Sequence, residues 1–252
     1  MSAPHFRDRP PRTFAIDGEV LEVKVRESAR ARTARLIVGP RRPLELITRR
    51  GMTDAELDAF LESKRAWITK KVAAARAIAG RQPRLGLQQQ GVAWLAGQRV
   101  PIMQTNGQRA SAELRAGQLV VRGRGNAAAS ALERWYRREA RRHVAAVAKA
   151  QAERLDLRFA SVAIRDPRTR WGSCSRQRNL SFSWRLLLAP PAVLEYVVVH
   201  ELLHLREPSH TRAFWRLVDA AQPGWREAAR WLREHGQELR DYRPERALDG
   251  LL

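Results

Sequence analysis

Residues 192–205 read AVLEYVVVHELLHL, and this stretch decides the fold of the C-terminal third of the chain. Valine and leucine fall on nearly every face of the helix that it predicts, and a helix that is apolar all round is buried. Pro190 and Pro191 precede it, where proline is tolerated in a first turn. Two histidines and a glutamate inside this helix need partners, because an unpaired buried charge or imidazole is costly.

A metal ion is the partner that the spacing of these residues favours. His200 and His204 are four residues apart, so both imidazoles project from one face and reach the same ion. Glu201 follows the first histidine, where its carboxylate can reach a water at the metal without binding the metal itself. This is the pattern of a helix-borne zinc peptidase site, with the glutamate as general base.

A third metal ligand is expected, since catalytic zinc sites have three protein ligands and one open position. His210 is the predicted ligand: Pro208 and Ser209 end the helix and turn the chain, and the next helix is expected from about Thr211. We therefore expect one zinc ion per chain. Weaker candidates lie further along, among arginines or near the chain's end: Glu227, Glu234 and His235.

Five segments are expected from composition and periodicity. Alternating apolar and polar residues predict strands, helical spacing predicts helices, and turn residues mark the joints. Thr53 followed by Glu56 is typical of a helix start, and Ala116-Gly117 is a predicted turn between two strands. The segments are a 1–13 extension, a β-rich region with a helix at 14–80, a linker and second strand group at 81–125, a catalytic region at 126–240, and a tail at 241–252.

The net charge of +21, from 47 Lys and Arg against 26 Asp and Glu, leaves two interpretations open. A surplus of this size attracts polyanions, and nucleic acid is the commonest of them in a cytoplasm. Arginine-biased composition with solvated helix faces explains the same numbers, because the charge is spread along the chain. Trp135 and Tyr136 among arginines fit a nucleic-acid surface, but an amphipathic helix with its aromatic residues in the core is the preferred interpretation.

The apolar runs and the cysteine content bear on location. No apolar run is long enough to cross a bilayer, and residues 1–11 are polar and proline-bearing, unlike a secretory signal. Cys174 is the single cysteine, so no intramolecular disulfide forms. A cytoplasmic protein without membrane contact is expected, and its oligomeric state stays open.

Three motifs in order make the chain resemble the YgjP-like metal-dependent hydrolases, a zincin family related to the SprT and WLM-type metallopeptidases. They are residues 170–175 (RWGSCS), residues 183–186 (SWRL) followed by Pro190, and residues 196–205 (YVVVHELLHL) followed by His210 and by Phe214 and Trp215. The resemblance implies an α+β fold: a zincin-like domain, with a small sheet against the metal helix, preceded by a strand-rich N-terminal region. It also implies that His200, His204 and His210 bind zinc and that Glu201 is the catalytic base.

The first of these motifs, residues 170–175, is expected to shape the site. Gly172 permits a tight turn, Trp171 packs, and Ser173 or Cys174 lies near the metal helix. Cys174 as a nucleophile is the alternative, although no cysteine-peptidase context accompanies it. An extended peptide is expected to add to a sheet edge at Leu180, Ser181, Phe182 and Ser183, unless this strand belongs to an ordinary core hairpin.

The function expected from these residues is zinc-dependent hydrolysis of peptide bonds, with a peptide or protein as substrate. The alternative is a protein that binds nucleic acid through its basic surface and in which proteolysis is linked to DNA or lost. Tyr196 and several arginines are candidates for stabilising the oxyanion, and spacing does not choose among them.

Overall fold

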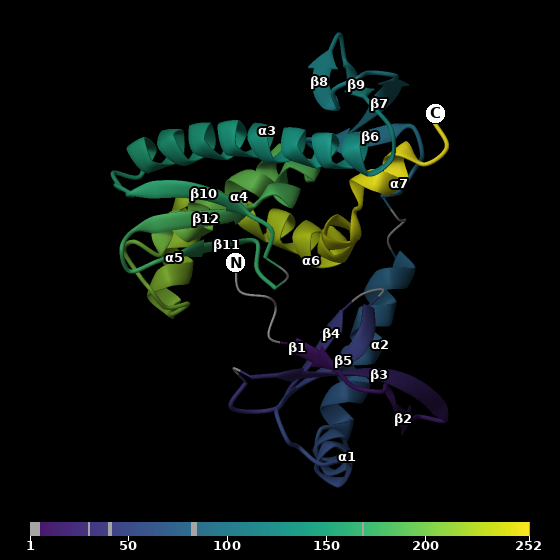
Figure 1. The fold of residues 1–252 in the computed structure, drawn as a ribbon. Coiled ribbons are helices and arrows are strands. Elements are labelled where there is room, and N and C mark those ends of the chain that lie inside the picture. Colours follow the sequence, from purple (N-terminus) through teal and green to yellow (C-terminus); the bar gives the residue numbers. More distant parts are fainter. Residues whose placement is uncertain (1–5, 30, 40–41, 82–84, 168, 252) are drawn as a thin grey trace. The chain divides into compact units, whose positions relative to one another are not determined.

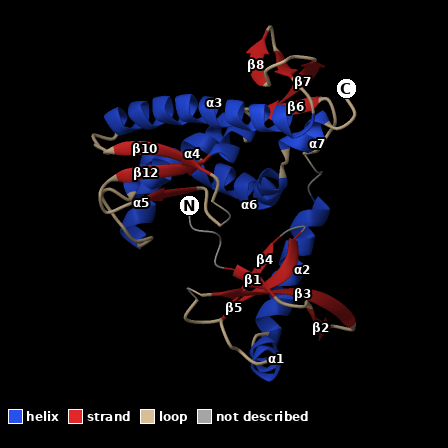
Figure 2. Ribbon diagram, in the orientation of Figure 1, coloured by secondary structure: helices blue, strands red, loops and turns tan. Residues whose placement is uncertain are grey.

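The computed structural model describes residues 6–29, 31–39, 42–81, 85–167 and 169–251, which form two compact units. The first unit is Met1–Pro83 and the second is Arg84–Leu252. Each unit contains helices and strands, so the chain has an α+β fold (Figures 1 and 2). Each unit is described by itself below.

The first unit is a five-stranded sheet covered by two helices. The long strand β3 pairs antiparallel with β1 and β2 and parallel with β5, which in turn pairs antiparallel with β4. Val23, Val25 and Leu46 are fully buried against Leu57 and Leu61 of the first helix. The elements are β1 (Phe6–Asp8), β2 (Arg12–Ile16), β3 (Glu19–Ser28), β4 (Arg35–Gly39), β5 (Arg42–Arg49), α1 (Asp54–Ser63) and α2 (Arg65–Arg81).

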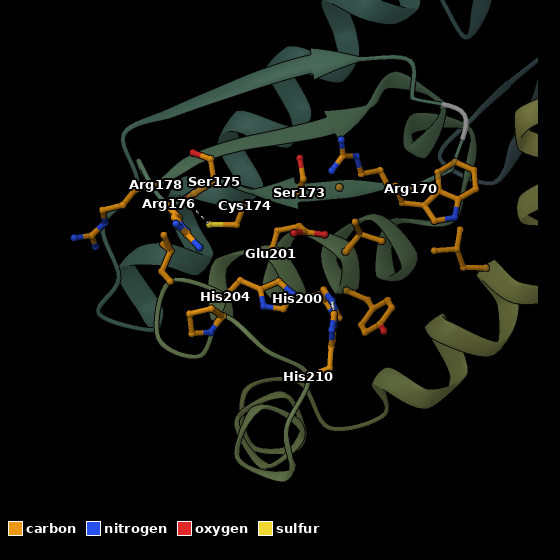
Figure 3. A pocket seen from close by; sticks show the side chains of 17 residues that line it. Arg170, Ser173, Cys174, Ser175, Arg176, Arg178, His200, Glu201, His204 and His210 are labelled. Carbon is orange, nitrogen blue, oxygen red and sulfur yellow. Dashed lines mark hydrogen bonds between the residues drawn. The ribbon is translucent and has the colours of Figure 1, made fainter. Parts of the chain in front are cut away.

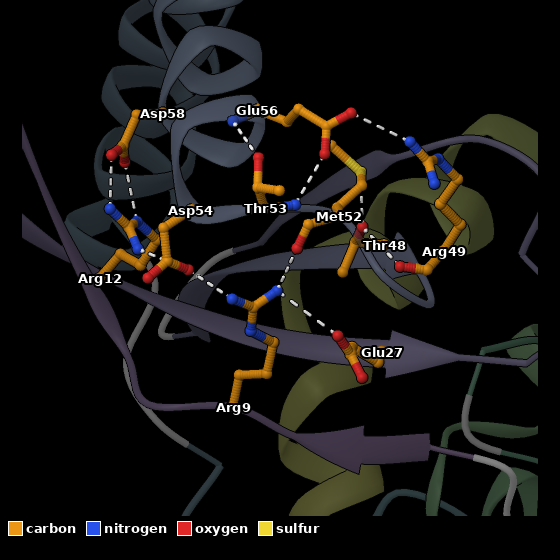
Figure 4. A network of polar contacts seen from close by, with 10 residues as sticks. All are labelled: Arg9, Arg12, Glu27, Thr48, Arg49, Met52, Thr53, Asp54, Glu56 and Asp58. Atoms are coloured by element: carbon orange, nitrogen blue, oxygen red, sulfur yellow. Dashed lines mark hydrogen bonds and ion pairs between the residues drawn. The ribbon is translucent and has the colours of Figure 1, made fainter.

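The predicted helix start at Thr53 is confirmed. Its hydroxyl accepts from the backbone N–H of Glu56, and the Glu56 carboxylate accepts from the N–H of Thr53. Two arginines lie near this cap: Arg9, which follows β1, donates to the Met52 carbonyl, and Arg12 of β2 binds the Asp58 carboxylate through two nitrogens (Figure 4). Exposed ion pairs of this kind contribute about 0–1 kcal/mol each, so the apolar contacts above dominate the unit's stability.

The second unit begins with a four-stranded sheet in the order β6-β7-β9-β8. Ala116 and Gly117 both have positive φ, as the type I′ turn of a two-residue hairpin requires, and they join β8 to β9 where the sequence predicts a turn. The strands are β6 (Val92–Leu95), β7 (Gln98–Thr105), β8 (Ser111–Arg115) and β9 (Gln118–Arg122).

Helix α3 (Gly125–Arg154) is amphipathic and buries its aromatic residues. Trp135 is 4% exposed and Tyr136 is fully buried, with its hydroxyl bonded to the backbone of Trp94 and to the hydroxyl of Tyr242. The interpretation that these aromatics belong to the core is therefore confirmed, and they are not available to stack on nucleic acid bases.

A three-stranded sheet carries the motif residues. It consists of β10 (Ser161–Arg165), β12 (Asn179–Ser183) and β11 (Gly172–Cys174), in that order. Strand β12 is therefore central, parallel to β10 and antiparallel to β11. The prediction that residues 180–183 form a free edge is wrong, because both hydrogen-bonding sides of this strand are occupied by neighbours.

The remaining elements are helical and share one core with all strands of this unit. The strand group β6–β9 and residues of the C-terminal stretch, expected as a tail, belong to that core. Arg185 fastens the stretch by donating to the carbonyls of Leu239 and Tyr242 while binding Asp166 through two nitrogens. The elements are the 3-10 helix η1 (Trp184–Leu188), α4 (Pro191–Leu203), α5 (Arg212–Ala221), α6 (Trp225–Asp241) and α7 (Pro244–Leu248).

Helix α4 is the buried helix that the sequence predicts. Nine of its side chains are buried, and they include Val198, Val199 and Leu202, which are fully buried. Within the described ranges, no helix combines the length and the apolar character that crossing a membrane requires.

Candidate metal centre and active site

The three predicted metal ligands converge on one point. His200 lies in the last turn of α4, His204 is its C-cap residue, and His210 lies just before α5 (Figure 3). One ring nitrogen from each histidine can be chosen so that all three lie within 4.8 Å of one another. The turn between α4 and α5 brings His210 close to His200 and His204.

Contacts around the rings orient their nitrogens. Nδ1 of His204 lies 3.0 Å from the carbonyl oxygen of Glu207. Because a carbonyl only accepts, this nitrogen carries the proton, and Nε2 keeps the lone pair that a metal needs. The ring of Phe214 stacks on His204 at 4.5 Å between centroids. Nε2 of His200 and Nε2 of His210 lie 2.9 Å apart, so both face the same space.

Burial keeps two of the imidazoles in their neutral, ligand-competent form. Burial, together with the neighbouring His204 and His210, lowers the pKa of His200 to about 4. Burial and His204 also lower the pKa of His210. Nδ1 of His200 is buried without a hydrogen-bond partner among the described residues. Three imidazoles whose ring nitrogens converge fit a borderline metal ion such as zinc.

Glu201 lies beside the histidines and is 8% exposed. Burial raises the pKa of its carboxyl to about 7, while the charge of Arg170 and a hydrogen bond from the backbone N–H of Cys174 act in the opposite direction. Its side chain occupies the space over Gly172, where a Cβ atom would lie 2.6 Å from Cγ of Glu201. The sequence predicts a tight turn at this glycine, whereas Gly172 begins strand β11, and the Glu201 side chain fills the space that its own side chain would need.

Strand β11 and α4 border one pocket of about 790 Å³. All three histidines and Glu201 line it, together with the four residues predicted to shape the site: Trp171, Gly172, Ser173 and Cys174. Trp171 also packs against Gly236, and the guanidinium of Arg240 lies 4.0 Å from its ring centroid. Burial and the charge of Glu201 raise the pKa of the Cys174 thiol, which makes it a poor nucleophile.

The residues predicted to bind substrate lie elsewhere. Leu180, Ser181, Phe182 and Ser183 do not line the pocket, and all but Ser181 are buried in the sheet core. Sequence reasoning missed the arginines that line the pocket and flank β11: Arg170, Arg176 and Arg178. The available signal was their position at both ends of the RWGSCS motif.

Comparisons with known proteins agree with this geometry. A family model for the YgjP-like metallopeptidase domain matches residues 32–235, so the class of protein is a metallopeptidase, which depends on a metal ion. The chain belongs to the YgjP-like family, and the predicted resemblance and zincin-like α+β fold are confirmed.

A solved structure, entitled as the metallopeptidase zymogen of abylysin from Pyrococcus abyssi, is also similar. The alignment covers 35% of this chain and 91% of that chain at 23% identity, with a TM-score of 0.33. That score is too low for the two folds to be equated. No curated protein matches the chain significantly.

Proposed function

We propose that the chain is a zinc-dependent peptidase in which His200, His204 and His210 hold one zinc ion and Glu201 is the general base. The observation that carries the proposal is the convergence of three imidazoles beside a buried carboxylate in one pocket. Membership of a metallopeptidase family supports a metal ion and a peptide substrate.

The donor set supports zinc in particular. Zinc binds imidazole nitrogen readily, and catalytic zinc sites leave one of four positions open. A bound zinc ion would polarise the carbonyl of the substrate and lower the pKa of a water molecule.

Glu201 is suited to move the proton. A general base is most effective when its pKa lies near the working pH, and burial raises the pKa of this carboxyl to about 7. The backbone N–H of Cys174 holds the carboxylate in place over Gly172. In the proposed reaction Glu201 removes a proton from the attacking water and delivers it to the nitrogen of the leaving amine.

Strand β11 offers the backbone to which a peptide substrate can add. Trp171 accepts from the N–H of Ser183, and the N–H of Ser175 donates to Asn179, so these two positions turn their backbone toward β12. Bonding alternates along antiparallel strands, so the backbone groups of Gly172 and Cys174 face away from β12. The Cys174 N–H already bonds Glu201, which leaves both groups of Gly172 and the carbonyl of Cys174 for a peptide. An extended peptide alongside this edge would lie beside Glu201 and the histidines.

The test is metal content together with cleavage of an unfolded, reduced and alkylated protein. We expect about one zinc per chain, and Glu201→Gln should keep the zinc but lower the cleavage rate by about 10²–10⁴-fold. The matched control is Glu153→Gln, which changes an exposed glutamate of α3 and should cleave like wild type. A protein purified without metal that takes up no zinc, or a Glu201→Gln variant as fast as wild type, would contradict the proposal.

A further inference from the structure

Positive charge is concentrated around the pocket. Besides the three histidines, its charged lining residues are Arg170, Arg176, Arg178 and Glu201. The one carboxylate of this lining is therefore the proposed general base, and the charge of Arg170 acts on it. A substrate that enters the pocket meets a strongly electropositive surface.

The three arginines are exposed and hold no side-chain ion pair with any residue that the structure describes. Unpaired arginines are common on a chain of net charge +21. These three differ from the others in their place: they line the pocket that holds the histidines and Glu201. A concave surface lined by one sign of charge concentrates its field and attracts ligands of the opposite sign.

Their order along the chain matches the direction of an extended peptide. Arg170 lies before β11, whereas Arg176 and Arg178 lie beyond its other end (Figure 3). Strand β11 covers only Gly172–Cys174, so the two groups bracket a short edge strand at its opposite ends. A peptide paired with β11 would carry side chains near both groups, on either side of the bond beside Glu201.

We propose that the site selects acidic peptides, with aspartate or glutamate on both sides of the cleaved bond. Arg170 binds the carboxylates at one end of the peptide, and Arg176 with Arg178 binds those at the other. Guanidinium groups bind carboxylates through two parallel hydrogen bonds, which gives selectivity as well as attraction. This inference rests on the proposed peptidase function, whose substrate class it specifies.

The experiment compares three unstructured peptides that are identical except for their flanking residues: glutamate, glutamine or lysine. We expect kcat/KM at low ionic strength to be at least about fivefold higher for the glutamate peptide than for the glutamine peptide, and to fall as salt is added. Arg170→Gln and the double variant Arg176→Gln, Arg178→Gln should each move this ratio toward one. Replacing Arg176 and Arg178 by glutamate should favour the lysine peptide.

Arg141→Gln is the matched control, because Arg141 is an exposed arginine on α3 that does not line the pocket. It should leave the glutamate-to-glutamine ratio as in wild type. A second measurement uses Glu201→Gln, which should hold peptides without cleaving them, and records the Kd of each fluorescently labelled peptide.

The outcomes distinguish a failure of the acidic preference from a failure of the proposed peptidase function. If wild type cleaves all three peptides equally well, the acidic preference is wrong while the peptidase function stands. If no peptide is cleaved but Glu201→Gln binds the glutamate peptide tightest, the inference on binding holds and the peptidase function falls. If a single-stranded oligonucleotide binds through these arginines and acidic peptides do not, the pocket serves nucleic acid and the inference is overturned.

Discussion

Helices α3 and α4 lie in the same unit but place their polar side chains in opposite environments. On α3, charged side chains lie on the outer face, where Glu133 pairs with Arg137 and Glu139 with Arg142 within one turn. On α4, nine side chains are buried, Glu201 among them, and the adjacent His200 is half-buried. Because water solvates such groups poorly, they need a specific partner, and a buried polar group on an apolar helix therefore marks a site.

The largest expected effect comes from removing a histidine from α4. His204→Ala should abolish zinc binding and reduce peptide cleavage to background, because two ligands cannot hold a catalytic zinc. His143→Ala changes the exposed histidine of α3 and should retain both properties. Elemental analysis and a cleavage assay check the pair. Equal zinc content in the two variants would mean that His204 does not bind the metal, and that the histidines of the two helices do not differ in this respect.

The second-largest effect comes from filling the space over Gly172 of β11, which the Glu201 side chain of α4 occupies. Gly172→Ala places a methyl group within 2.6 Å of the Glu201 side chain and should displace its carboxylate. We expect about a 10²-fold loss of kcat, since misplacing a catalytic group by about 1 Å has an effect of that size. Zinc content should be unchanged, because the three histidines are untouched. Activity like that of wild type would show that the carboxylate has room to move.

A substitution on the buried face of α3 should lower the stability of the folded protein. Tyr136→Phe leaves the buried backbone of Trp94 and the hydroxyl of Tyr242 without their partner, and should lower the free energy of unfolding by about 1–3 kcal/mol. Burial raises the pKa of Tyr136 to about 12 from its usual 10.0. Wild type should therefore lose stability as the pH rises from 10 to 12, because the unfolded chain releases this proton first. Denaturant titrations that show the same pH dependence in both proteins would contradict this.

The smallest effect belongs to the exposed face of α3. Glu139→Gln removes an ion pair with Arg142, whose side chain is 71% exposed, and should change the unfolding free energy by at most about 0.5 kcal/mol. Denaturant titration measures the change. A loss as large as that expected for Tyr136→Phe would mean that the outer face of α3 is not solvated as the structure shows.

Much of the local structure follows from short-range sequence patterns. The cap at Thr53, the proline at the start of α4 and the turn at Ala116–Gly117 each depend on residues within a few positions, and each lies where the sequence predicts. The face shared by His200 and His204 follows from helical geometry. Sequence likewise predicts α1 and α2 as one helix, whereas the structure interrupts it at Lys64, whose φ of −107° is not helical.

Order within a sheet is harder to predict, because it depends on pairing between distant segments. Residues 179–183 have the same alternating pattern whether they are central or at an edge, and only the partners β10 and β11 decide the matter. The C-terminal stretch is similar: residues 241–252 are expected to be a tail, yet Tyr242 and Ala247 are fully buried, and Arg185 binds the Tyr242 carbonyl.

The sequence by itself indicated the chemistry of the candidate centre: two imidazoles and one carboxylate spaced along a buried helix, and a third imidazole beyond its end. Helical periodicity and the cost of burying polar groups are local properties, so a single segment reveals them. Only the tertiary structure decided which strand borders the histidines, why Gly172 lacks a side chain, and that arginines flank the pocket at both ends of β11. These features depend on the packing of β11 against α4, which joins residues that the sequence keeps about 30 positions apart.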